Sequence, residues 1–223
     1  MPHNIVFVVG PPRTGTSVLV KCLEKSGYNI GKQMLGHKYL SQNTVFRRAN
    51  RKIKRLLYEQ LVGSGHDPKK PVEIGEPIAE EIKKFWRYAT LYKIEVLKDP
   101  LFYEIFGVYW MVNPLFREQK FIWTHRDPLE AAKSAVRLKY IKNVPEAEPL
   151  TSYTVKGRLK TFDTYENIHA TYYNRTDGVN VHFEDLLNDT ESVGKELSEF
   201  LERPFDTSMI STKETFKEKG EPQ

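Results

Sequence analysis

The feature that most constrains the fold of this chain is a short apolar run that ends in a glycine-containing loop. Residues 5–9, Ile-Val-Phe-Val-Val, predict a buried strand, and the loop starts at Gly10. Residues 17–25 then predict a helix, because their apolar side chains share one helical face. These side chains are Val18, Leu19, Cys22 and Leu23. A strand, a glycine loop and a helix in this order gather backbone N–H groups and a helix N-terminus at one point, where they can hold an anion.

The loop has the spacing of a phosphate-binding loop for nucleoside triphosphates, with one difference. Four residues separate Gly10 from Gly15, but Thr16 stands where that loop carries a lysine. That lysine neutralises the β- and γ-phosphates, so its absence favours an anion of another shape. Arg13 supplies a planar fork of donors instead. The alternative is a tight turn without a ligand; the arginine and three hydroxyl side chains beside the predicted helix start favour an anion site.

A second strand and helix lie further along the chain. Residues 121–124 predict a short buried strand, and Pro128 suits the first turn of a helix. The apolar face expected for that helix comprises Leu129, Ala132 and Val136. Arg126 ends the strand and Ser134 lies two turns into the helix, so both side chains can reach one phosphate. The alternative for Arg126 is a surface ion pair with Asp127.

Together, these two segments resemble the nucleotide-binding motifs of sulfotransferases that use 3′-phosphoadenosine 5′-phosphosulfate. Residues 13–17, Arg-Thr-Gly-Thr-Ser, resemble the family's 5′-phosphosulfate loop. Arg126, within Arg-Asp-Pro, and Ser134, eight residues later, resemble its 3′-phosphate segment. Two supporting segments are similar to elements of the bacterial branch: residues 94–102 contain Lys-Asp-Pro, and residues 179–187 contain Val-x-Phe-Glu-Asp-Leu.

The resemblance implies a reaction and a set of donor-binding residues. A sulfuryl group would pass in line from 3′-phosphoadenosine 5′-phosphosulfate to a hydroxyl or amine of a small molecule, glycan or peptide, leaving adenosine 3′,5′-bisphosphate. No metal is expected, because a sulfuryl group carries less charge than a phosphoryl group and the sequence has no metal-ligand spacing. The implied donor-binding residues are Pro12, Arg13, Thr14, Gly15, Thr16, Ser17, Arg126 and Ser134.

Lys98 is the expected catalytic cation. It follows an apolar run, so in a parallel sheet it would lie at the carboxyl edge, where open α/β folds bind ligands. The general base is less defined. Many sulfotransferases that this chain resembles have a histidine two residues after a lysine at this strand end, where this chain has Pro100. The candidates are His37, Asp99 and Glu76.

The order of predicted elements indicates one α/β domain over residues 1–223. Short apolar strands that alternate with helices predict a parallel sheet with helices on both faces. The resemblance implies that this is the three-layer, P-loop-like sulfotransferase fold. The predicted strands cover residues 5–9, 94–97, 121–124 and 179–183. The predicted helices cover residues 17–25, 102–112, 129–140, 155–174 and 190–201. A helical insertion is expected at about 33–92, and a polar tail at about 206–223.

Composition limits the partners. The chain has 223 residues, a formal net charge of +5 and one cysteine, which excludes an internal disulfide. The sequence shows no signal peptide and no membrane span, so we expect a cytoplasmic protein or a soluble fragment whose anchor was removed. The charge favours acidic ligands, yet it is too small for a dedicated nucleic-acid binder. Residues 47–55 hold six basic side chains. These form either a solvated helix face or a rim for an acidic acceptor or the nucleotide.

Two other functions stay open at this point. A P-loop kinase for a small metabolite fits the loop spacing, but the missing lysine counts against it. A non-catalytic protein that binds a sulfonucleotide or nucleic acid is also possible, with residues 47–55 as its contact surface.

Overall fold

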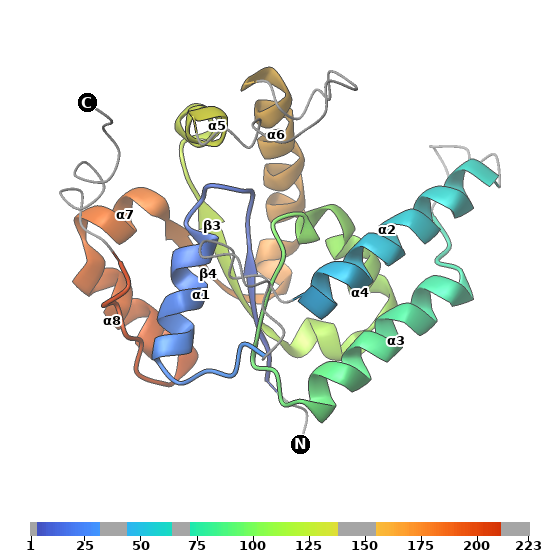
Figure 1. Cartoon of the computed structure of the whole chain (residues 1–223), viewed down its shortest axis with the longest axis horizontal. Coiled ribbons are helices and arrows are strands. Elements are labelled where there is room, and N and C mark those ends of the chain that lie inside the picture. Colours follow the sequence, from blue (N-terminus) through green and yellow to red (C-terminus); the bar gives the residue numbers. More distant parts are fainter. Residues whose placement is uncertain (1–3, 32–43, 64–71, 138–154, 211–223) are drawn as a thin grey trace.

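A parallel four-stranded sheet forms the centre of the computed structural model, which describes residues 4–31, 44–63, 72–137 and 155–210 (Figure 1). The strands are β1 (Val6–Val9), β2 (Val96–Lys98), β3 (Lys120–His125) and β4 (Asp177–His182). Their spatial order is β2-β1-β3-β4, and every neighbouring pair is parallel. In this register, Val8 lies opposite Lys98 on one side and Ile122 on the other. The predicted parallel sheet is therefore confirmed.

Helices flank both faces of this sheet. They are α1 (Thr16–Lys25), α2 (Thr44–Gly63), α3 (Glu76–Leu91), α4 (Phe106–Val112), α5 (Pro128–Arg137), α6 (Val155–Tyr172), α7 (Phe183–Asn188) and α8 (Thr190–Leu201). Short 3₁₀ turns are η1 (Phe102–Ile105), η2 (Pro114–Glu118) and η4 (Tyr173–Arg175). Figure 1 shows α1, α7 and α8 on one side of the sheet and α2, α3 and α4 on the other. The predicted α/β class with helices on both faces is confirmed.

The alternation of side chains along β1 explains the two layers of core. Val6 and Val8 point to one face and pack with α1, α7 and α8, whereas Phe7 and Val9 point to the other face. On that second face, Phe7 stacks between Phe102 and Phe121, with ring centroids 5.4 Å away in each case. This aromatic core packs against α2, α3 and α4 and holds them rigidly to the sheet, because aromatic rings bury large areas in few conformations.

Several predicted elements need correction. β2 starts at Val96, two residues later than expected. The Ile94 amide donates to the Ala89 carbonyl, so this residue closes the C-terminal end of α3 and is not part of the strand. Phe183 begins α7 instead of ending β4. The predicted helix over 102–112 begins as the 3₁₀ turn η1. In α5 the buried residues include Ala131 and Ala132, but Leu129 is 43% exposed, because the first turn of α5 lies at the surface.

The predicted helical insertion contains α2 and α3, which run side by side at one end of the molecule (Figure 1). The buried stripe of α2 is apolar at Phe46 and Ile53, as its spacing indicates. Residues 64–71, as well as the tail from 211, lie outside the described residues. No helix in the described ranges is long and apolar enough to cross a membrane.

Candidate functional site at the carboxyl edge of the sheet

The four strands bring the motifs that are distant in sequence to one edge. Since all strands are parallel, their C-terminal ends lie together, which is where open α/β sheets bind ligands. The loop of residues 10–15 follows β1, Lys98 ends β2, Arg126 follows β3 and Glu184 lies just after β4. The structure therefore brings together both expected phosphate segments and the expected catalytic lysine.

The loop after β1 has a backbone that requires its glycines. A Cβ atom on Gly10 would lie 1.9 Å from the Thr124 hydroxyl oxygen. Gly15 has φ of 90° and lies against Phe183, so a side chain there would be both strained and crowded. Arg13 also has a positive φ, 79°. Such strained non-glycine positions cost about 1–3 kcal/mol and gather at functional sites.

Gly15 is also the N-cap residue of α1, and no side chain caps the helix there. The first amides of a helix have no intrahelical acceptor and carry the positive end of the helix dipole. The first turn of α1 contains no acidic residue that would compete with an anion. The loop and the start of α1 thus form a cradle that suits a phosphate or sulfate group.

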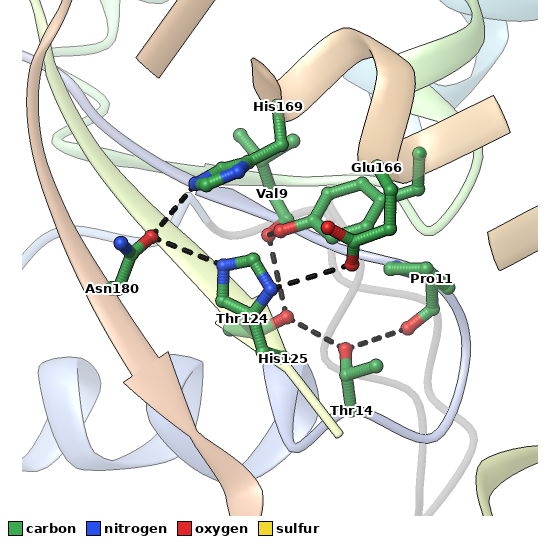
Figure 2. Close-up of polar contacts among 9 residues, drawn as sticks. Val9, Pro11, Thr14, Thr124, His125, Glu166, His169 and Asn180 are labelled. Atoms are coloured by element: carbon green, nitrogen blue, oxygen red, sulfur yellow. Dashed lines mark hydrogen bonds and ion pairs between the residues drawn. The ribbon is translucent and has the colours of Figure 1, made fainter. Parts of the chain in front are cut away.

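The hydroxyl groups of Thr14 and Thr124 hold the loop of the cradle in shape (Figure 2). The Thr14 hydroxyl donates to the Pro11 carbonyl at 2.8 Å and lies 2.6 Å from the Thr124 hydroxyl. The Thr14 side chain is fully buried. Its hydroxyl therefore fixes the shape of the loop, and only the backbone of Thr14 can face a ligand in this arrangement.

Arg13 joins the two expected phosphate sites. Its Nε atom donates to the Ser134 hydroxyl at 3.2 Å, and its carbonyl accepts from Arg126 Nη1 at 3.1 Å. The Arg126 guanidinium lies 4.2 Å above the Phe183 ring and 3.8 Å from a Glu184 oxygen. Arg126 is thus oriented by a ring, a carboxylate and the loop itself. Arg126 pairs with Glu184, whereas the Asp127 carboxylate accepts from the Glu130 amide at 2.8 Å.

Lys98 reaches the cradle from β2. Its Nζ atom donates to the Ser17 hydroxyl at 2.9 Å, and only 3% of the residue is exposed. Burial lowers the pKa of Lys98 to about 8; Asp99 opposes this shift, and the positive charges of Arg47 and Arg13 add to it. The structure therefore places a cation of unusually low pKa beside the first turn of α1.

Asp99 lies at the start of a buried polar chain. Its Oδ2 accepts from the Asn50 amide at 3.0 Å, and its Oδ1 accepts from the Leu101 backbone at 3.3 Å. The Asn50 oxygen in turn accepts from the Tyr109 hydroxyl at 2.9 Å. Burial raises the pKa of Tyr109 well above its usual value, so this phenol stays a donor. Sequence reasoning missed Asn50 and Tyr109, although a polar residue on the apolar stripe of α2 is a usable signal.

Of the other two candidate bases, the structure describes only Glu76. His37 lies outside the described residues. Glu76 begins α3, where the Gly75 amide donates to Gln60. Gln60 lies ten residues beyond Asn50 in the same helix, which corresponds to about 15 Å. The structure therefore separates Glu76 from Asp99 and the cradle.

A histidine cluster that sequence reasoning also missed supports the end of β3 (Figure 2). His125 and His169 both approach the Asn180 side-chain oxygen, at 3.0 and 2.9 Å. Glu166 lies 3.5 Å from the other nitrogen of His125. Burial lowers the pKa of His125, so the neutral ring is favoured in the fold. This cluster fixes the residue directly before Arg126. In the part of the chain that the structure describes, no three His, Cys, Asp or Glu side chains are arranged to hold a metal ion.

Fold and site together define an open α/β domain with an anion cradle and converging cations at its carboxyl edge. A model of the sulfotransferase family matches residues 5–207, so the chain belongs to that family. No curated protein sequence matches the chain.

Two solved structures share the fold. The sulfotransferase domain from the olefin synthase of Synechococcus PCC 7002 superposes with a TM-score of 0.55 at 18% identity, covering 99% of this chain and 82% of that domain. The sulfotransferase domain from the curacin biosynthetic pathway gives 0.53 at 19% identity, covering 94% of this chain and 77% of that domain. At these identities the likeness concerns the fold.

Proposed function

We propose that this protein transfers a sulfuryl group from 3′-phosphoadenosine 5′-phosphosulfate to an acceptor hydroxyl or amine. Membership of the sulfotransferase family supports sulfuryl transfer in general. The observation that carries the choice of donor is the hydrogen-bonded link of Arg126, Arg13 and Ser134. This link puts two arginines from separate segments beside one cradle, as a nucleotide with phosphates at both its 5′ and 3′ positions requires.

The residues present fit such a donor. The backbone of residues 13–17, with the hydroxyl groups of Thr16 and Ser17, would hold the 5′-phosphosulfate at the start of α1. Gly15 allows the positive φ of this loop and its close packing against Phe183. Arg126 and Ser134 would hold the 3′-phosphate, and a planar guanidinium suits a phosphate because it offers paired donors. Pro12 would shape the entry to the loop.

The reaction is an in-line displacement at sulfur. The acceptor oxygen or nitrogen forms a bond to sulfur and loses its proton, while the bond between sulfur and the 5′-phosphate oxygen breaks. The products are a sulfate ester or sulfamate, adenosine 3′,5′-bisphosphate and one proton. Negative charge grows on the leaving phosphate oxygen as its bond breaks. A protonated Lys98 next to Ser17 would stabilise that charge mainly in the transition state.

Asp99 is the base that we propose for the acceptor proton. It directly follows Lys98 and, although 4% exposed, it lines a hollow that opens beside α2. Its hydrogen bonds to Asn50 and Leu101 hold the carboxylate in one orientation and leave acceptor capacity on both oxygens.

The first experiment compares ligands by thermal unfolding of the full chain. Adenosine 3′,5′-bisphosphate should raise the unfolding midpoint, because a ligand at about one hundred times its dissociation constant stabilises by roughly 2.7 kcal/mol. AMP should raise it clearly less, since it lacks the 3′-phosphate. Equal shifts from the two nucleotides would overturn the 3′ site. A larger shift from ATP with magnesium would favour a kinase instead.

A further inference from the structure

The six basic residues of α2 do not form one uniform surface. Arg47, Arg51 and Lys54 line a hollow next to β2. Arg48 and Lys52 line a second hollow between α2 and α3. These positions differ because residues three and four apart share a helix face, and the two sets start one residue apart. All except Arg47 are exposed, which confirms that much of the run faces solvent.

The hollow next to β2 adjoins the proposed catalytic residues. It is a small hollow with a cavity volume of about 30 Å³, and it opens to solvent. Asp99 and Asn50 form its polar wall, and the apolar wall comprises Leu101 and Ile105. Asp99 is the residue after Lys98, and Arg47 acts on Lys98 electrostatically. A group bound in this hollow would therefore lie beside the point where the acceptor must meet the donor.

The charged side chains around this hollow differ in their ion pairs and hydrogen bonds. Lys54 is paired with Glu104, and Asp99 is held by Asn50. Arg51 is exposed, and it forms no ion pair with any acidic side chain among the described residues. Within the described ranges, the rim thus presents Arg51 as an exposed guanidinium outside any ion pair, and Arg47 lies one helical turn away.

The second hollow is a natural comparison. It also has three cations and one carboxylate, contributed by Arg48, Lys52, Lys84 and Glu81. There, however, Glu81 is paired with Lys52 at 2.5 Å, and the walls come from α2 and α3 alone. No residue of the carboxyl edge lines it. The two hollows therefore carry similar charge, but only the hollow next to β2 adjoins the proposed catalytic residues.

We infer that the hollow of Arg47, Arg51 and Asp99 is an acceptor subsite for an anionic acceptor, one that carries a carboxylate or sulfate besides the group that receives sulfur. Arg51 and Arg47 bind the anion, which delivers the acceptor hydroxyl or amine to Lys98 and Asp99. Charge-assisted pairs of guanidinium and carboxylate give both affinity and orientation. This inference rests on the proposed function for the identity of the reaction, but the binding itself does not.

The test uses one acid and its neutral analogue. The probes are 3-(4-hydroxyphenyl)propanoate and 3-(4-hydroxyphenyl)propanamide, which share the phenol and differ in charge. Binding of each to the full chain is measured by ligand-observed NMR titration, with and without saturating adenosine 3′,5′-bisphosphate. Transfer of a radiolabelled sulfuryl group from 3′-phosphoadenosine 5′-phosphosulfate to each probe is measured in parallel. We expect the acid to bind about tenfold more tightly than the amide, the lower limit for a hydrogen bond to a charged group.

Matched variants locate the effect. Arg51→Gln should remove the preference for the acid, whereas Arg48→Gln, which removes an equal charge from the second hollow, should leave it unchanged. Both side chains are exposed, so neither change should unfold the protein. Equal binding of acid and amide by the wild type, weak binding of both included, would overturn the inference. An equal loss in the two variants would also overturn it, because it would show only the general positive field.

The outcomes separate this inference from the proposed function. If acid binding depends on Arg51 but adenosine 3′,5′-bisphosphate does not bind, the anion subsite stands and the donor assignment fails. If the bisphosphate binds and the acid has no advantage over the amide, the donor assignment stands and the anion subsite fails.

Discussion

The β1–β3 side of the carboxyl edge and the β2 side use polar groups in contrasting ways. On the β1–β3 side, loop, strand end and helix are bonded to one another through Arg13, Thr14 and Arg126. On the β2 side, Lys98 and Asp99 are buried, and an open hollow with a basic rim adjoins Asp99. The first side suits one ligand shape, whereas the second combines the buried pair that we propose to be catalytic with an accessible surface.

The largest expected effect concerns Lys98, on the β2 side of the carboxyl edge. In Lys98→Met, we expect the rate of sulfuryl transfer in a single turnover to fall by roughly 10² to 10³, by analogy with the loss of one oxyanion donor. Affinity for adenosine 3′,5′-bisphosphate should change far less, because the leaving-group charge is fully developed only during reaction. The thermal midpoint should stay within a few degrees, since the change also removes a buried charge. A wild-type transfer rate would leave Lys98 as a structural residue of the β2 side.

Arg126→Ala tests the donor side, as we call the β1–β3 side of the carboxyl edge where we propose that the nucleotide binds. We expect a loss of about 1.5–3 kcal/mol in affinity for adenosine 3′,5′-bisphosphate, the range for hydrogen bonds to charged groups. The preference for the bisphosphate over AMP should shrink with it in calorimetric titrations. Arg175→Ala is the matched control, because Arg175 also lies over aromatic rings but precedes β4, away from the carboxyl edge. Unchanged discrimination in Arg126→Ala would remove Arg126 from the 3′ site.

The pH dependence separates two roles for Lys98. Its pKa of about 8 means that the cation is present below pH 8 and is lost above it. If the cation stabilises the leaving group, kcat/KM should decline above pH 8, approaching tenfold per pH unit. In Lys98→Arg this decline should disappear, because arginine stays charged. A kcat/KM that instead rises through pH 8 would make neutral Lys98 the base and displace Asp99.

The smallest effect on ligand binding is expected from the Thr14 hydroxyl, which bonds within the loop. Thr14→Val leaves the Pro11 carbonyl without its donor and should cost about 1–3 kcal/mol of unfolding free energy, measured by urea denaturation. Thr171→Val, an exposed position whose hydroxyl bonds within α6, should change it by less than about 0.5 kcal/mol. In the folded variant, affinity for the bisphosphate should be nearly unchanged. A large loss of affinity would show that the Thr14 hydroxyl faces the ligand after all.

Much of the donor side could be predicted from the sequence, because its parts are local. The spacing of Gly10 and Gly15, and of Arg126 and Ser134, is set within single strand–loop–helix units. Glycine suits both positions, because Gly15 has a positive φ and Gly10 lies where a Cβ atom would meet Thr124. The alternation of apolar strands and helices likewise implied a parallel sheet whose carboxyl edge collects the motifs.

Only the tertiary structure decided what those residues do to one another. The direction of the Thr14 hydroxyl and the burial of Lys98 depend on packing against β3 and α1, which no local pattern encodes. The chain from Asp99 through Asn50 to Tyr109 joins three elements, and the histidine cluster joins β3, β4 and α6. The basic run of α2 was visible in the sequence, but its division between two hollows was not. A helix period shows which side chains share a face, whereas the identity of the neighbouring surface arises from contacts distant along the chain.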